Sequence, residues 1–273
     1  RALLIARTDA WPNTVNATRG RKIPILLFSA TFHEGSSRLS GISRSINIET
    51  LKHIDFIQCV SEEDEATLRS LGISQTKVTG DTRYDQVLAR LAEKKHLPIG
   101  LTGALKERRF IAGSVWSEDL DPVIQAARET REAYDHTLVL VPHEISDGFI
   151  QEIEAKTKGL KTARLSELES GQKKTDRNLD VMIIDRIGIL AELYNLGDIA
   201  FVGGSFRKSV HSVMEPLAAG CFTIVGPYHQ NNREAVAFQK IHAKPLAVPI
   251  VTATSTRDGL SKTLRALWET TAH

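Results

Sequence analysis

Ile199-Ala-Phe-Val-Gly-Gly-Ser205 is an apolar strand that ends in two glycines, and Val210-His-Ser-Val-Met-Glu-Pro-Leu-Ala-Ala-Gly220 follows it. The second stretch predicts a short helix that begins near His211 and ends at Gly220. Glycines after a strand let a ligand approach the backbone closely, and free N–H groups at a helix start favour a phosphate. A Gly-Gly pair alone is equally typical of a tight turn. The later Glu-Pro and Gly-Pro pairs favour a nucleotide-sugar pocket between Phe201 and Asn232.

Strand-like and helix-like stretches alternate along the 273 residues, which predicts an α/β fold with parallel sheets and crossover helices. The expected strands are residues 3–6, 23–30, 54–60, 77–79, 109–112, 137–141, 181–184, 199–202 and 222–225. Helices are expected after Trp11, after the capping box of Ser61 and Asp64, and over 120–133, 149–158, 189–195, 211–220 and 257–271. Residues 31–45 and 166–178 are polar and are expected to be loops.

The charged stretch 86–108 contains Pro98, Gly100 and Gly103 and no buried strand. It predicts a helix and a linker with a domain boundary between them, and we divide the chain into residues 1–95 and 96–273. Arg1 is followed at once by an apolar strand, so the chain is expected to begin inside a domain.

Composition excludes several classes of protein. Hydrophobic residues make up 41%, which argues against disorder, and a net charge of +2 without a basic run argues against nucleic-acid binding. Cys59 and Cys221 lie in apolar runs and are expected to be buried thiols without metal spacing. The sequence contains neither a signal peptide nor an apolar run near the roughly 18 residues that span a bilayer.

At this point a resemblance becomes visible, because several short motifs occur in one order along the chain. They are Asp9-Ala-Trp-Pro-Asn13, Ser61-Glu-Glu-Asp64, Val78-Thr-Gly-Asp-Thr-Arg-Tyr-Asp85, Ala112-Gly-Ser114, Leu140-Val-Pro-His143, Phe201-Val-Gly-Gly-Ser205, His211-Ser-Val-Met-Glu-Pro216 and Gly226-Pro227. The set resembles the 3-deoxy-D-manno-octulosonic acid (Kdo) transferases, a GT-B glycosyltransferase family.

The resemblance implies a GT-B fold of two Rossmann-like domains. Residues 1–95 would be an incomplete acceptor-side domain, and 96–273 the donor nucleotide-binding domain, with the terminal helix able to pack back on the first. The implied reaction transfers Kdo from CMP-Kdo to lipid A or its precursor in lipopolysaccharide assembly, without a metal or cofactor. The implied location is the cytoplasmic face of the bacterial inner membrane, where the enzyme is peripheral, and the present piece of chain would be soluble. The oligomeric state stays open.

The resemblance also implies a donor site. Its expected members are Ser114, His143, Gly203, Gly204, Ser205, His211, Glu215, Asn231 and Asn232. Ser205 and the amides around His211 would hold the phosphate, and Glu215 would bind the ribose. His143 could equally be a capped loop residue. Trp116 could stack on a ring, but packing under its loop is the favoured interpretation. Asp185-Arg186 could shape a pocket edge, and a structural salt bridge is favoured there.

Several departures from the family pattern limit what the resemblance implies. Asp9 stands where the family has Glu, so it is expected to be an auxiliary carboxylate or, equally, a helix cap. The main general base would lie outside this chain. The Arg of the family's Val-Pro-Arg-His has no counterpart, so a phosphate-neutralising cation would come from Arg207 or Lys208. Two alternatives remain open: a GT-B enzyme that uses a UDP-sugar, and a non-catalytic nucleotide-binding module.

Overall fold

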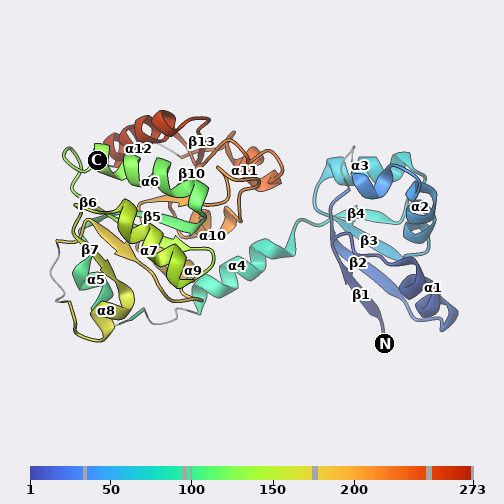
Figure 1. Ribbon diagram of the computed structural model, residues 1–273. Helices are drawn as coiled ribbons and strands as arrows, with labels where there is room; N and C mark the ends of the chain where they lie inside the picture. Colours follow the sequence, from blue (N-terminus) through green and yellow to red (C-terminus); the bar gives the residue numbers. More distant parts are fainter. Residues whose placement is uncertain (33–35, 94–96, 99, 174–177, 244–247, 272–273) are drawn as a thin grey trace. The chain divides into compact units, whose positions relative to one another are not determined.

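The computed structural model describes residues 1–32, 36–93, 97–98, 100–173, 178–243 and 248–271 (Figure 1). The chain divides into two compact units, Arg1–Gln86 and Val87–His273. Helix α4, Thr82–Ala92, contains the boundary.

The first unit is a parallel sheet with helices. Its strands follow the order β1 (Leu3–Ala6), β2 (Ile25–Ala30), β3 (Phe56–Cys59) and β4 (Thr76–Val78), and every pair is parallel. Its helices are α1 (Pro12–Gly20), the 3₁₀ turn η1 (Ser37–Leu39), α2 (Arg44–Lys52) and α3 (Glu62–Ser70). The expected strands, Pro12 at the start of α1 and the Ser61–Asp64 capping box are all confirmed.

Residues 33–35 fall outside the described part, and residues 36–43 form a loop with the single 3₁₀ turn η1. Helix α2 begins at Arg44, so the loop prediction for residues 31–45 is wrong at residues 44–45. The helix buries only Thr50 and Leu51, and both lie in its last turn. Its N-cap, Ser43, makes no side-chain hydrogen bond. Neither an apolar stripe nor a capping pattern therefore marks its start.

The second unit contains a seven-stranded sheet in which every pair is parallel. The order is β13 (Val251–Ala253), β10 (Phe222–Val225), β9 (Ile199–Val202), β5 (Arg108–Val115), β6 (His136–Pro142), β8 (Val181–Ile183) and β7 (Thr162–Arg164). A small antiparallel pair, β11 (His242–Ala243) and β12 (Val248–Pro249), stands apart from this sheet.

Helices cover both faces of the large sheet. The helices are α5 (Leu101–Ala104), α6 (Ser117–Thr130), α7 (Asp147–Lys156), α8 (Leu165–Glu169), α9 (Leu190–Tyr194), α10 (Met214–Ala218), α11 (Arg233–Phe238) and α12 (Arg257–Thr271). Along β5, Phe110 and Ala112 pack with α6, α7 and α12, whereas Ile111 packs with α5, α8 and α9. This alternation is why the strands are apolar throughout. In Figure 1 the red helix α12 runs beside the green helix α6.

Two predictions in this unit need correction. Residues 166–178 were expected to be a loop, but α8 occupies their beginning; it is too short to show a helical period, and 174–177 lie outside the described part. The helix expected near His211 begins only at Met214. The His211 N–H donates to the Gly203 carbonyl at 3.2 Å, which holds His211 against the end of β9 rather than in a helix.

The order of strands places a topological switch point at β5 and β9. From β5 the chain builds one side of the sheet with β6, β7 and β8, and β9 then begins the other side. The loops after β5 and β9 therefore leave in opposite directions, and ligands of open α/β sheets bind in the crevice formed there. No helix that the structure describes is both long and apolar enough to cross a bilayer.

Candidate functional site

Gly203 lets the ends of β5 and β9 close on each other. Its N–H donates to the Gly113 carbonyl at 2.8 Å. A Cβ atom at position 203 would lie 2.1 Å from the carbonyl oxygen of Ser114. Ser114 itself has a φ of 54°, in the left-handed region. The glycine expected to admit a ligand is thus already required by backbone packing at the switch point.

Asp119 ties the loop after β9 to the start of α6. The carboxylate is fully buried and accepts from the N–H groups of Trp116 at 2.9 Å, Gly204 at 2.7 Å and Phe206 at 3.0 Å. Burial raises the pKa of Asp119, while its three backbone donors lower it. The sequence reasoning missed this residue. Its position three residues after Trp116 is the spacing of a capping box, a signal that could have found it.

The adjoining turn uses Gly204 and Ser205. Gly204 has a φ of 78°, and its carbonyl accepts from the N–H of Ser209 at 3.1 Å, so the turn is tight. Ser205 is fully buried, and its hydroxyl donates to the Val202 carbonyl at 2.8 Å. The phosphate contact expected of Ser205 would require this bond to be given up.

Three aromatic rings meet beside this turn. The indole Nε1 of Trp116 donates to Nε2 of His211 at 2.9 Å. The ring of His143 stacks on His211 at 4.3 Å and on Trp116 at 4.4 Å, measured between ring centroids. Arg207 places its guanidinium 3.9 Å from the Trp116 ring centroid. Trp116, for which packing under its loop was favoured, instead contacts His143, His211 and Arg207.

The stack affects the chemistry of His211. Burial, and next the neighbouring His143, lower the pKa of His211, so the neutral ring prevails at neutral pH. A cavity of about 270 Å³ lies next to the stack. It is lined by Trp116, Ser117, Glu118, Glu144, Ser146, Phe149 and Arg207.

Asn232 fixes His211 from the other side. Its side-chain amide donates to the His211 carbonyl at 3.0 Å, while its Oδ1 accepts from the Ala235 N–H at 2.8 Å and caps α11. Asn231 is exposed next to it. The structure thus joins Ser114, His143, Gly203, Gly204, His211 and Asn232 through direct contacts, as the sequence predicts they would be neighbours.

Glu215 lies in the first turn of α10 and has a partner that the sequence did not reveal. Its carboxylate accepts from Arg90 of α4 at 3.0 Å. The two side chains are 26% and 41% exposed, so the pair is open to exchange with a ligand hydroxyl. Sequence distance hides this pair, because 125 residues separate its members.

Two cations flank the site on the loop after β9. Arg207 lies 3.6 Å from a carboxylate oxygen of Glu118, measured from Nε, and Lys208 is exposed.

In the first unit, Asp9 is 65% exposed and accepts from Arg38 at 2.9 Å. Trp11 is the N-cap of α1, so the alternative that Asp9 caps this helix is wrong.

Asp185 and Arg186 have separate partners instead of each other. Asp185 accepts from the N–H and the hydroxyl of Ser166, and Arg186 pairs with Glu169 at 2.7 Å. The expected salt bridge is therefore present at Arg186, with Glu169 as its partner, whereas Asp185 is held by hydrogen bonds.

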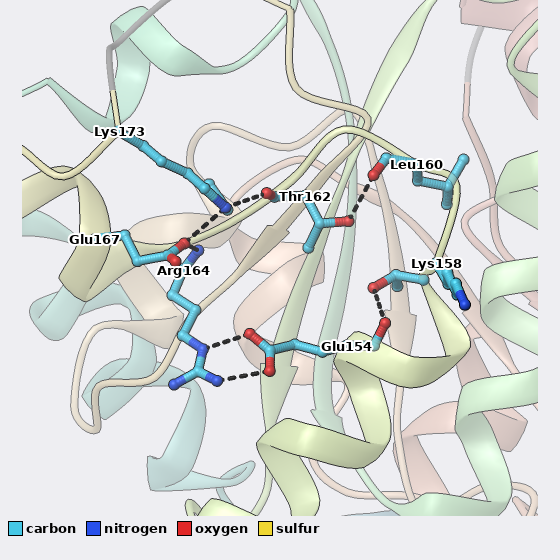
Figure 2. Close-up of a pocket in the computed structure, with 9 residues that line it drawn as sticks. Glu154, Lys158, Leu160, Thr162, Arg164, Glu167 and Lys173 are labelled. Carbon is cyan, nitrogen blue, oxygen red and sulfur yellow. Dashed lines mark hydrogen bonds and ion pairs between the residues drawn. The ribbon is translucent and has the colours of Figure 1, made fainter.

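Figure 2 shows a second cavity, of about 210 Å³, between α7 and the β7–α8 segment. Its charged groups largely neutralise one another. Arg164 binds Glu154 through two hydrogen bonds of 2.6 Å, and Lys173 pairs with Glu167 at 2.9 Å. A charged ligand would have to break these pairs, so the switch-point loops are the stronger candidate site.

Comparisons with known proteins agree with the motifs. The family model described as 3-deoxy-D-manno-octulosonic-acid transferase (kdotransferase) matches residues 1–86. A 3-deoxy-D-manno-octulosonic acid transferase of Aquifex aeolicus is 29% identical over 84% of this chain and 56% of its own length. One of Bordetella pertussis is 30% identical over 85% of this chain and 54% of its own. The chain therefore spans about half the length of these relatives.

Solved structures agree on the fold. The UDP-GlcNAc 2-epimerase of Neisseria meningitidis matches with a TM-score of 0.65 at 14% identity, over 98% of this chain and 68% of that one. A putative UDP-N-acetylglucosamine 2-epimerase of Listeria monocytogenes gives 0.64 at 15% identity, over 97% of this chain and 65% of that one. At such identities the likeness shows the GT-B fold alone. The family model over residues 1–86 and the curated relatives over about 85% of the chain together support the 3-deoxy-D-manno-octulosonic acid transferase family, to which the motifs point.

Proposed function

We propose that this chain is part of an enzyme that transfers Kdo from CMP-Kdo to lipid A or its precursor. Residues 96–273 bind the donor and residues 1–95 form the acceptor side, at the cytoplasmic face of the inner membrane. The observation that carries the proposal is the contact among the loops after β5, β6 and β9, made through Trp116, His143 and His211. It supports a ligand site at the switch point of a chain whose curated relatives are named Kdo transferases.

The donor would be held as follows. Lys208 and Arg207 supply positive charge for the phosphate, which becomes the leaving group with CMP. Glu215 accepts hydrogen bonds from the ribose hydroxyls after exchanging with Arg90. Asn231 and Asn232 border the same loops. Transfer also needs a general base for the acceptor hydroxyl, and Asp9 is the auxiliary carboxylate that the family motif suggests.

Calorimetry with CMP, UMP and UDP on the full chain tests this proposal. We expect CMP to bind more tightly than either uridine nucleotide. Tighter binding of UDP than of CMP would favour a UDP-sugar enzyme and contradict the Kdo assignment.

Matched lysine variants locate the binding site. Replacing Lys208 with alanine should weaken CMP binding about tenfold, the effect of losing one charge-assisted contact of about 1.4 kcal/mol. Lys158, which lines the cavity in Figure 2, is the control, and K158A should leave CMP affinity unchanged. The reverse result would place the nucleotide in the other cavity.

A further inference from the structure

The hydrogen bond between Trp116 and His211 determines which nitrogen of His211 carries the proton. An indole N–H can only donate. Since Trp116 Nε1 lies 2.9 Å from His211 Nε2, that imidazole nitrogen must be the acceptor. A neutral His211 therefore holds its proton on Nδ1. A protonated ring would instead place an N–H group against the indole N–H and lose the bond.

Other contacts keep the ring in this orientation. The His143 ring stacks on it with an angle of 13° between their planes. The main chain of His211 is held by Gly203 on one side and Asn232 on the other. A Cβ atom at Gly204 would lie 3.2 Å from Nε2, so this edge of the ring also faces the turn after β9.

The second ring nitrogen, Nδ1, remains available. Among the residues that the structure describes, none accepts a hydrogen bond from Nδ1 of His211. The side chain is only partly buried, so Nδ1–H can reach a ligand.

We propose that Trp116 is a positioning residue that fixes His211 as a neutral Nδ1–H donor to an oxygen of the bound nucleotide-sugar. This inference rests on the donor site proposed above. His211 would thus orient the ligand, whereas Arg207 and Lys208 would neutralise the negative charge of the ligand's phosphate. Of the charged or titratable groups around His211, His143 stacks on its ring, and Arg207 lies over the ring of Trp116 with Glu118 beside it.

Nitrogen NMR of the ¹⁵N-histidine-labelled full chain tests the tautomer without any ligand. The His211 signals are identified by their absence from H211Q. We expect the wild-type protein at pH 7.5 to show Nδ1 protonated and Nε2 unprotonated. In Trp116→Phe, which keeps an aromatic face but no donor, the Nε2–H form should become the major one. A wild-type His211 with its proton on Nε2 would overturn the proposal. This outcome is measured on the wild-type protein and does not depend on whether the variants fold.

Calorimetry of CMP with two His211 variants tests the role of Nδ1–H. The amide nitrogen of asparagine can occupy the position of Nδ1, whereas glutamine places its amide near Nε2. H211N should therefore lose no more than about threefold in CMP affinity and H211Q about tenfold, the effect of one hydrogen bond. Equal losses, or a larger loss in H211N, would overturn the ligand-facing role.

The two measurements separate this proposal from the function on which it rests. If the tautomer is as expected but the wild-type chain does not bind CMP, the donor site and the ligand-facing role both fail, while the action of Trp116 on His211 stands. If CMP binds and the tautomer is wrong, the donor site stands and the positioning role of Trp116 fails.

Discussion

Removal of the Asp119 carboxylate should destabilise the second unit and open the loop after β9. The variants are D119A, which deletes all three acceptor contacts, and D119N, which keeps one oxygen but turns an NH₂ group toward a backbone donor. The matched control is D121N on the same helix, whose carboxylate is 47% exposed and pairs with Lys156.

The expected magnitude follows from the three N–H groups that lose their acceptor. The bond to Gly204 is buried, so leaving this donor unpaired costs about 1–3 kcal/mol. The bonds to Trp116 and Phe206 are partly buried, and water can replace some of each, for about 0.5–1 kcal/mol apiece. D119A should therefore lower the free energy of unfolding by about 2–5 kcal/mol. D119N should lower it less, by about 1–3 kcal/mol, because it also removes a buried charge.

Urea denaturation followed by tryptophan fluorescence measures these changes, since Trp116 and the buried Trp268 both lie in the second unit. The D121N control should change the unfolding free energy by less than about 0.5 kcal/mol. A D119A protein within about 1 kcal/mol of the wild type, or no less stable than D121N, would refute the argument that Asp119 holds this loop.

Three further predictions follow. G203A should lose about 3 kcal/mol of stability because its Cβ would meet the Ser114 carbonyl. The control G148A, which adds a Cβ in open space within α7, should raise the melting temperature slightly. Equal shifts of the melting temperature in the two variants would contradict the close approach at Gly203. E215Q should weaken CMP binding about tenfold in calorimetry, and unchanged affinity would exclude a ribose contact. The free energy of unfolding should change by less than about 1 kcal/mol, since the ion pair between Glu215 and Arg90 is partly exposed. Burial lowers the pKa of His136 below its usual value of 6.5, so below that pH the unfolded chain binds a proton that the folded protein excludes. The free energy of unfolding should therefore fall as the pH drops below 6.5, and it should fall less in H136N, whose amide can still donate to the Tyr134 carbonyl. A steeper loss in H136N would contradict this cause.

The sequence predicted the inner strands of the large sheet and the terminal helix well, because these elements have a local apolar pattern. It missed β7 and β13, the two edge strands of that sheet, each of which is only three residues long. Residues 257–271 form α12 as expected, and the strand at 199–202 is β9. Helices α2 and α8 were missed because each buries only two residues. Too few apolar positions remained to show a period.

Several residues that the sequence assigned to the site are in contact with one another, but the contacts themselves were not predicted. Motif order brought Ser114, His143 and His211 together, yet the bond from Trp116 to His211 joins residues 95 apart, and no local pattern reports it. The same holds for Arg90 and Glu215. Side-chain pairs of this kind depend on how the loops leave the sheet, and this becomes visible only in three dimensions.

The hydrogen bonds made by Asp119 and Asn232 have a consequence for how the site could come to prefer a different nucleotide-sugar. Because they already connect the loops with one another, the main chain around Gly204 and His211 has little freedom left to lose when a nucleotide arrives. A shift of preference from one nucleotide-sugar to another should therefore arise at exposed side chains such as Lys208 and Asn231. Substitutions there alter contacts without disturbing the loops, so we expect libraries at these positions to give folded variants.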